Sequence, residues 1–161
     1  MSTSHGLPHD VPYGGSLWLT NRNQNGAGEN SVSVPPQVRT LNATIALVQE
    51  TRHYGLFNYF LSAKADHWKS AKQGLNELGA HQSAEIFGSA IEVFGNAGPA
   101  PTLDDRGLQI EKFTETQRAR MTKLSDTWAL GIDRLDVKLP LHVLKHKEVF
   151  QTFERLLRSR R

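Results

Sequence analysis

Residues 50–80 decide how this chain folds, and they read ETRHYGLFNYFLSAKADHWKSAKQGLNELGA. The stretch places one glycine, Gly55, among closely spaced aromatic side chains, which indicates a turn followed by a short helix. Asp66 is placed to cap the next helix at its N-terminus. The apolar residues of that helix recur on one face: Trp68, Ala71, Leu75 and Leu78. Gly79 suits the position just after the last helical residue.

Outside this stretch, apolar residues also recur at helical spacing, and glycine or proline separates the runs. Pro35-Pro36 is a suitable entry to a helix that carries Val38, Leu41, Ile45 and Val48. Further helices are expected to open at Ser83, to run from about residue 115 to 130, and to begin at Pro140, which fits a first turn. No segment alternates as a strand does. The sequence therefore predicts an all-α fold, a compact bundle of about five or six helices.

The beginning of the chain differs in composition from the rest. Residues 21–36 read NRNQNGAGENSVSVPP and have no periodic apolar face, so they bury too little surface to offset the entropy of ordering. The sequence predicts a flexible N-terminal arm over residues 1–34 and a helical domain over residues 35–161. Trp18 lies in an apolar islet of the arm, which makes it a candidate for docking on the domain or on a partner.

Composition restricts the class of protein. The 161 residues are 38% hydrophobic and 22% charged, values that fit a single globular domain. The absence of cysteine excludes disulfides, thiolate nucleophiles and cysteine-based metal sites. No run approaches the roughly 18 apolar residues of a membrane span, and no secretory signal is evident. These features favour a cytoplasmic protein without a membrane partner.

The positive charge is concentrated at the C-terminal end. The net charge is +3, and residues 134–161 contain eight Lys or Arg but three Asp or Glu. The arginines that end the chain are candidates for contact with phosphate groups or with an acidic protein surface: Arg155, Arg158, Arg160 and Arg161. Cations also stabilise the end of a helix through its dipole, so a solvated helix end remains an alternative.

The motif around Gly55 resembles that of the DNA-mimic-protein-like domain family. That family has an acid, then Asn-Gly-Gly-Phe, a Gln, a pair of aromatic or aliphatic residues and a later Asn. The matching positions here are Glu50, Gly55, Leu56, Asn58, Tyr59-Phe60 and Ser62. His53 and Tyr54 replace the family's Asn-Gly, and because the β-carbon of Tyr54 disfavours a positive φ, a less tight turn is expected.

Other positions extend the resemblance over about residues 36–153: Leu78-Gly79-Ala80, Arg106 and Leu124-Ser125-Asp126-Thr127-Trp128. The resemblance implies an all-helical fold. The family is named after an acidic member that presents carboxylates in place of DNA phosphates and so occupies a DNA-binding protein. The basic groove of such a protein would repel a chain of net charge +3, so mimicry by the whole surface is not expected here.

The motif residues are expected first to build structure, with Leu56, Tyr59 and Phe60 in the core and Asn58 capping or bridging backbone groups. The alternative is a binding face. Its candidate residues are Glu50, His53, Tyr54 and Asn58.

Catalytic and metal signatures are weak. His142 and His146 have a metal-ligand spacing, but Val143 stands where a zinc hydrolase carries its Glu, and Lys145 and Lys147 would oppose a cation. Residues 100–107 are expected to be a loop whose acids are solvated. The sequence also contains no nucleophile-elbow pattern and no phosphate-binding glycine loop. No enzyme activity, cofactor or metal is expected.

The sequence favours a non-enzymatic module that binds another macromolecule, most directly a protein, as a regulator or inhibitor. A nucleic-acid-binding protein that uses the basic C-terminal helix is the alternative. Exposed apolar residues on one helix would also fit a homodimer.

Overall fold

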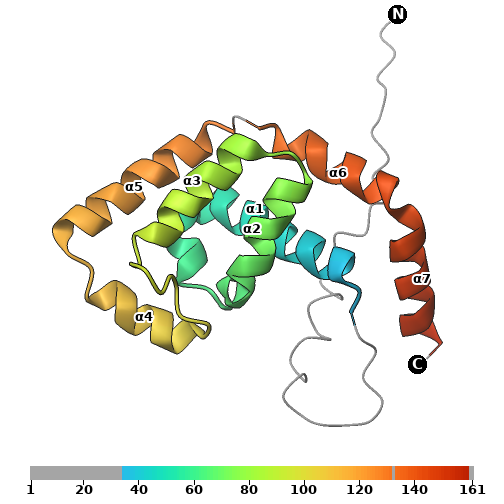
Figure 1. The fold of residues 1–161 in the computed structure, drawn as a ribbon, viewed down its shortest axis with the longest axis horizontal. Coiled ribbons are helices and arrows are strands. Elements are labelled where there is room, and N and C mark those ends of the chain that lie inside the picture. The colour runs from blue at the N-terminus through green and yellow to red at the C-terminus, as the bar shows by residue number, and fades with distance from the viewer. Residues whose placement is uncertain (1–33, 132, 160–161) are drawn as a thin grey trace, which may run out of the picture. The chain divides into compact units, whose positions relative to one another are not determined.

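The computed structural model describes residues 34–131 and 133–159, which belong to one unit, Ser33–Arg161. These residues form seven α-helices and one short 3-10 helix, and no strand occurs among them (Figure 1). The expected all-α fold is therefore confirmed. Almost all of the predicted arm, with Trp18, lies outside the described residues, as do Arg160 and Arg161.

The elements follow one another along the chain and pack around the first helix. Their bounds are α1 Pro36–Phe60, the 3-10 helix η2 Ala63–His67, α2 Trp68–Glu77, α3 His81–Glu92, α4 Leu103–Glu111, α5 Glu115–Ala129, α6 Leu135–Lys145 and α7 Lys147–Arg158. Helix α1 contacts η2, α2, α5, α6 and α7, while α3 packs against α2 and α5. In the described part of α6 and α7, the buried hydrophobic side chains are Leu139 and Phe153, so these helices cover the core from its edge.

Aromatic side chains occupy the centre of this core. Tyr59 and Phe60, at the end of α1, are fully buried and both contact Phe87 of α3. The rings of Phe60 and Phe87 are stacked, with centroids 5.8 Å apart. Trp128 of α5 also contacts Phe87, with ring centroids 6.3 Å apart, and its indole N–H donates to the Thr51 hydroxyl at 2.8 Å. The expectation that the motif's aromatic pair fills the core is confirmed.

Gly55 bends α1. Its φ of 75° and ψ of 174° interrupt the helix, so the two helices expected here form one kinked element. The Leu56 N–H donates to the Ser125 hydroxyl of α5 at 3.2 Å. The side-chain amide of Asn58 donates to the Tyr54 carbonyl at 2.6 Å, so it caps one backbone carbonyl just before the kink. Among the described non-glycine residues, only Arg134 has a positive φ, so Tyr54 does not adopt the positive φ that its β-carbon disfavours.

The end of α2 was predictable from sequence, but its beginning was not. Gly79 adopts a φ of 63°, and the N–H groups of Gly79 and Ala80 donate to the carbonyls of Asn76 and Leu75, each at 2.9 Å. This pair of bonds is the Schellman motif, which confirms the predicted position of Gly79. The prediction that Asp66 caps α2 is wrong, because α2 begins at Trp68 and its N-cap position is occupied by His67.

Three other expected boundaries are also wrong. Helix α3 opens at His81 rather than at Ser83. Part of the expected loop 100–107 is helical, because the Thr102 hydroxyl accepts from the Asp105 N–H and caps α4. The expected last helix is two helices that meet at His146, and Pro140 lies inside α6 instead of in a first turn. Among the described helices, none combines the length and apolar character needed to cross a membrane.

Candidate functional site

The predicted face around the motif is only partly free. The Glu50 carboxylate pairs with Lys64 and its side chain is 14% exposed. The Asn58 amide is taken up by the Tyr54 carbonyl. His53 and Tyr54 are exposed neighbours whose ring centroids lie 6.0 Å apart. Of these four residues, His53 and Tyr54 are thus the ones whose exposed side chains make no hydrogen bond or ion pair with another described residue.

The predicted basic end is described as far as Ser159. Arg155 and Arg158 are exposed on α7. Arg158 lies 3.9 Å from the Glu154 carboxylate, and the Arg155 Nε donates to the Gln151 carbonyl at 3.4 Å. The same helix carries Glu148, so the positive surface of α7 is interrupted by acids.

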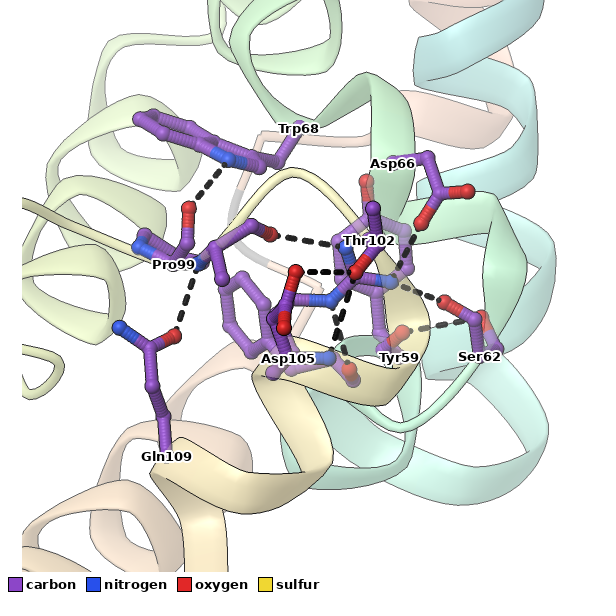
Figure 2. Close-up of polar contacts among 11 residues, drawn as sticks. Tyr59, Ser62, Asp66, Trp68, Pro99, Thr102, Asp105 and Gln109 are labelled. Atoms are coloured by element: carbon purple, nitrogen blue, oxygen red, sulfur yellow. Dashed lines mark hydrogen bonds and ion pairs between the residues drawn. The ribbon is translucent and has the colours of Figure 1, made fainter.

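Arg106 anchors a buried polar network that the sequence did not reveal. The side chain is fully buried. Its Nε donates to the Phe60 carbonyl at 3.0 Å, and Nη1 donates to the Ala100 carbonyl at 3.0 Å. Nη2 donates to the Ser62 carbonyl at 2.8 Å and to the Asp66 carboxylate at 2.7 Å (Figure 2). One guanidinium therefore ties the end of α1 and η2 to α4 and the loop before it.

The same loop is held by two more side chains. Gln109 accepts from the Ala100 N–H at 2.8 Å and donates to the Gly98 carbonyl at 3.2 Å. The Trp68 indole donates to the Pro99 carbonyl at 3.1 Å, and Figure 2 shows this bond and the one accepted by the Gln109 side chain beside those of Ser62 and Asp66. Since every donor in this set bonds to the chain itself, the network supports the fold rather than presenting groups to a ligand.

Tyr59 adds one unsatisfied group to this region. Its hydroxyl is buried and has no hydrogen-bond partner among the described residues. Burial raises the pKa of the phenol, while the positive charge of Arg106 lowers it by less. The phenol is therefore neutral at ordinary pH, and its role in the core is that of an aromatic ring.

In the described part of the chain, no group of three His, Asp or Glu side chains lies close enough together to hold a metal ion. His142 and His146 have ring centroids 4.6 Å apart, at the junction of α6 and α7. Burial and the neighbouring His146 lower the pKa of His142. This pair alone supplies two nitrogen ligands.

The hollows on the surface of the described residues include the following two. One, of about 340 Å³, is lined by Trp68, Ile91, Glu92, Gly95, Asn96, Ala97 and Gly98. The other, of about 320 Å³, is lined by Pro35, Glu148, Val149, Thr152, Phe153 and Leu156. Neither lining brings together the paired titratable groups that acid–base chemistry requires.

The outer face of α6 is apolar. Nine large hydrophobic side chains are exposed in the described residues, and five of them belong to the segment from Leu130 to Leu156, both ends included. Val137, Leu141 and Leu144 are 43%, 59% and 66% exposed, and their spacing places them on one side of α6. We call these three residues the α6 stripe. Leu139 is buried on the side that faces the core, so α6 carries apolar residues on both of its sides.

The α6 stripe has cations beside it that no acid of the described residues pairs with. Arg134 pairs with Asp136, and the Lys138 ammonium donates to the Gly79 carbonyl at 2.6 Å. Lys145 and Lys147 are exposed and make no hydrogen bond or ion pair with another described residue. Two free cations therefore lie where the stripe ends and α7 begins.

Asp133, in the connection before α6, caps α3 from a distance. Its carboxylate accepts from the Ser83 N–H at 2.6 Å and lies 3.9 Å from the Lys138 ammonium. Burial raises the pKa of Asp133, but the Ser83 hydrogen bonds and the charges of Lys138 and His81 together outweigh it and hold the pKa below its ordinary value. The ionised form is thus favoured in the folded state.

We predict that Asp133→Asn lowers the free energy of unfolding by about 1–2 kcal/mol near neutral pH, because a charge-assisted cap is lost. A depressed folded-state pKa contributes stability above the unfolded pKa and loses it as pH falls through the folded value. The difference between wild type and variant should therefore shrink as the pH falls below about 4. Urea titrations over this range measure it. Asp126→Asn, at an exposed position, is the control, and a pH-independent difference for Asp133→Asn would contradict the electrostatic account.

Comparison with known proteins identifies one family. The family described as DMP19-like protein has a sequence model that matches residues 33–146, more than half of the chain. The match covers α1 to α6 and ends at the α6–α7 junction. No curated protein and no solved structure gives a significant match.

Proposed function

Since this chain belongs to the DMP19-like protein family, we propose that it is a non-enzymatic module that binds another protein, as a regulator or inhibitor. The observation that carries the proposal is the α6 stripe, three exposed aliphatic side chains on one side of a helix. Contiguous exposed apolar surface of this kind is characteristic of protein interfaces. The net charge of +3 argues against mimicry of DNA by the whole surface.

The energetics of the α6 stripe fit a binding role. Burying a Val or Leu side chain that was exposed contributes roughly 1.5–3 kcal/mol. Three such residues supply several kcal/mol, a substantial share of the roughly 8 kcal/mol that corresponds to micromolar affinity. In water, these three side chains gain none of this free energy. They also contribute little to the core, because Leu139 is the side chain by which α6 packs there.

Two ion pairs within the fold support a non-enzymatic role. Arg106 and Asp66 bind each other and the backbone, and Glu50 binds Lys64. A general acid or base must reach a substrate proton, and these groups are occupied within the fold. The exposed surface of α6 instead offers aliphatic carbon, which favours recognition over chemistry.

Nucleic-acid binding through α7 is the second candidate. It is favoured by the exposure of Arg155 and Arg158, which the sequence continues with Arg160 and Arg161. Phosphate contacts of this kind make affinity fall steeply as salt rises. Glu148 and Glu154 on the same helix weaken the case. Truncation after Leu157 that leaves nucleic-acid binding intact would argue against it.

The test is affinity capture of the tagged full-length protein from its native cells, with nuclease added. We predict one stoichiometric protein partner, whose recovery drops about tenfold or more for Leu144→Asp, because a buried carboxylate without a partner is strongly unfavourable. Leu108→Asp is the matched control, since Leu108 is 55% exposed on α4. Equal capture by both variants would refute the proposal. Nucleic acid recovered only without nuclease, and no protein partner, would support the second candidate.

A further inference from the structure

We propose that the partner contacts the α6 stripe with an amphipathic helix that carries carboxylates beside its aliphatic side chains. This inference rests on the proposed function and adds to it the chemistry of the contacting element. It follows from the shape of the stripe and from the charges at its end.

The shape of the α6 stripe matches a helix. Val137, Leu141 and Leu144 follow the i, i+4, i+7 row of an α-helix and so form a ridge about 10 Å long. Such a ridge packs into the groove between the side-chain rows of a second helix. Recognition of an amphipathic helix through aliphatic anchors at this spacing is a common mode of protein binding.

The charges point to an acidic helix. Lys145 lies one turn beyond Leu141 and Lys147 begins α7. Most other cations of this region are already compensated: Arg134 by Asp136, Lys138 by Asp133 and Arg158 by Glu154. On α6 and α7 themselves, the acid without an ion pair is Glu148, so Lys145 and Lys147 leave an excess of positive charge at the end of the stripe. Glu77 of α2 also lies near α6, on the side of His142, where its carboxylate accepts hydrogen bonds from Thr40 and Gln73. Carboxylates on the partner's helix would meet these lysines and set its orientation.

A second copy of the chain fits this surface less well. A twofold interface presents the same residues from both sides, so it would bring Lys145 and Lys147 without adding an unpaired acid other than Glu148. A membrane surface is also a poorer match, because three aliphatic side chains over two turns offer little area for insertion. Both remain outcomes that the experiment detects.

The test is selection from a displayed library of helical peptides on the immobilised full-length protein. The peptides are about 18 residues long, enough to form a helix, with Leu or Ile at i, i+4 and i+7 and Glu, Gln or Lys randomised at the flanking positions. We expect Glu to be enriched over Lys by about tenfold at low ionic strength, and less as salt rises. Enrichment without a preference for Glu would overturn the proposal.

Two variants make the result specific. Leu144→Asp should abolish the enrichment, while Leu108→Asp should preserve it, since Leu108 lies on α4. The double variant Lys145→Glu with Lys147→Glu should shift the preference from Glu to Lys, because the charge at the end of the stripe is reversed. An unchanged preference in the double variant would overturn the proposal, since the lysines would then not be the recognition element.

Other readouts separate this inference from the proposed function. If the cellular partner is lost with Leu144→Asp but unaffected by the double lysine variant, the module binds protein and the acidic-helix inference is wrong. If Leu144→Asp leaves capture intact, the proposed function itself fails at this surface. Self-association by sedimentation, or binding to phosphatidylserine vesicles, that is lost with Leu144→Asp would also overturn the inference, because another occupant would then cover the stripe.

Discussion

Replacing Arg106 by methionine is expected to lower the free energy of unfolding by about 3–5 kcal/mol. The methionine side chain fills much of the same volume but donates no hydrogen bond. It would leave the carbonyls of Phe60, Ser62 and Ala100 without the donor they now share, and Asp66 without its cation. Because a domain of this size is stable by about 5–15 kcal/mol, the variant should be marginally folded at room temperature.

The measurement is the midpoint and slope of urea unfolding, followed by circular dichroism. Arg120→Met is the matched control: Arg120 is 51% exposed, and its ion pair with Glu92 should contribute about 0.5 kcal/mol or less. Arg106→Lys should fall between the two, because an ammonium keeps the charge but cannot reproduce the planar fork of a guanidinium. A loss for Arg106→Met no larger than that of Arg120→Met would show that the network does not hold the fold.

The features that sequence predicted correctly have local determinants. Gly79 ends α2 because the residues that bond around it lie within one turn. The helix expected at about residues 115–130 is α5, Glu115–Ala129, and its start is fixed by a reciprocal capping box between Thr114 and Gln117. Periodic apolar spacing gave the helical class for the same reason, since a helical face repeats every few residues.

The features that sequence missed depend on distant partners. Arg106 bonds to groups that lie up to 46 residues away, and its acceptors are mostly backbone carbonyls, which have no signature in the sequence. Asp66 is of a residue type that often caps helices, but its carboxylate accepts a hydrogen bond from the buried guanidinium of Arg106 instead. The start of α3 was misplaced for a similar reason, since the carboxylate that caps its first turn comes from Asp133.

Helix α6 shows a third limit of sequence patterns. Leu135 packs against the core and Leu139 is buried, so the residues before Pro140 gain from being helical and the proline is accommodated inside the helix. Apolar residues recur on both sides of α6, and periodicity alone does not say which side meets the core. Packing against α1 and α7 decides it, and this leaves the α6 stripe exposed.

Gly74→Ala is expected to lower the free energy of unfolding by about 2–3 kcal/mol, although alanine is the better helix former by about 1 kcal/mol. Gly74 lies inside α2 where that helix crosses α1. A β-carbon there would lie 2.0 Å from the Thr44 hydroxyl and 2.9 Å from the Thr40 carbonyl oxygen. The second contact is with backbone, so rotating a side chain cannot relieve it and the two helices must separate.

Gly107→Ala is the matched control, because Gly107 lies inside α4 and a β-carbon there meets nothing within 4 Å. This variant should gain about 0.5–1 kcal/mol from helix propensity, so the two Gly→Ala changes should have opposite signs in the same urea titration. Adding Thr44→Ala to Gly74→Ala should restore part of the loss by removing the closer clash, while the contact with the Thr40 carbonyl persists. If Gly74→Ala were stabilising, α1 and α2 would pack less closely than the structure shows. The orientation of the motif and of the core aromatic rings on α1 would then also differ from the one described.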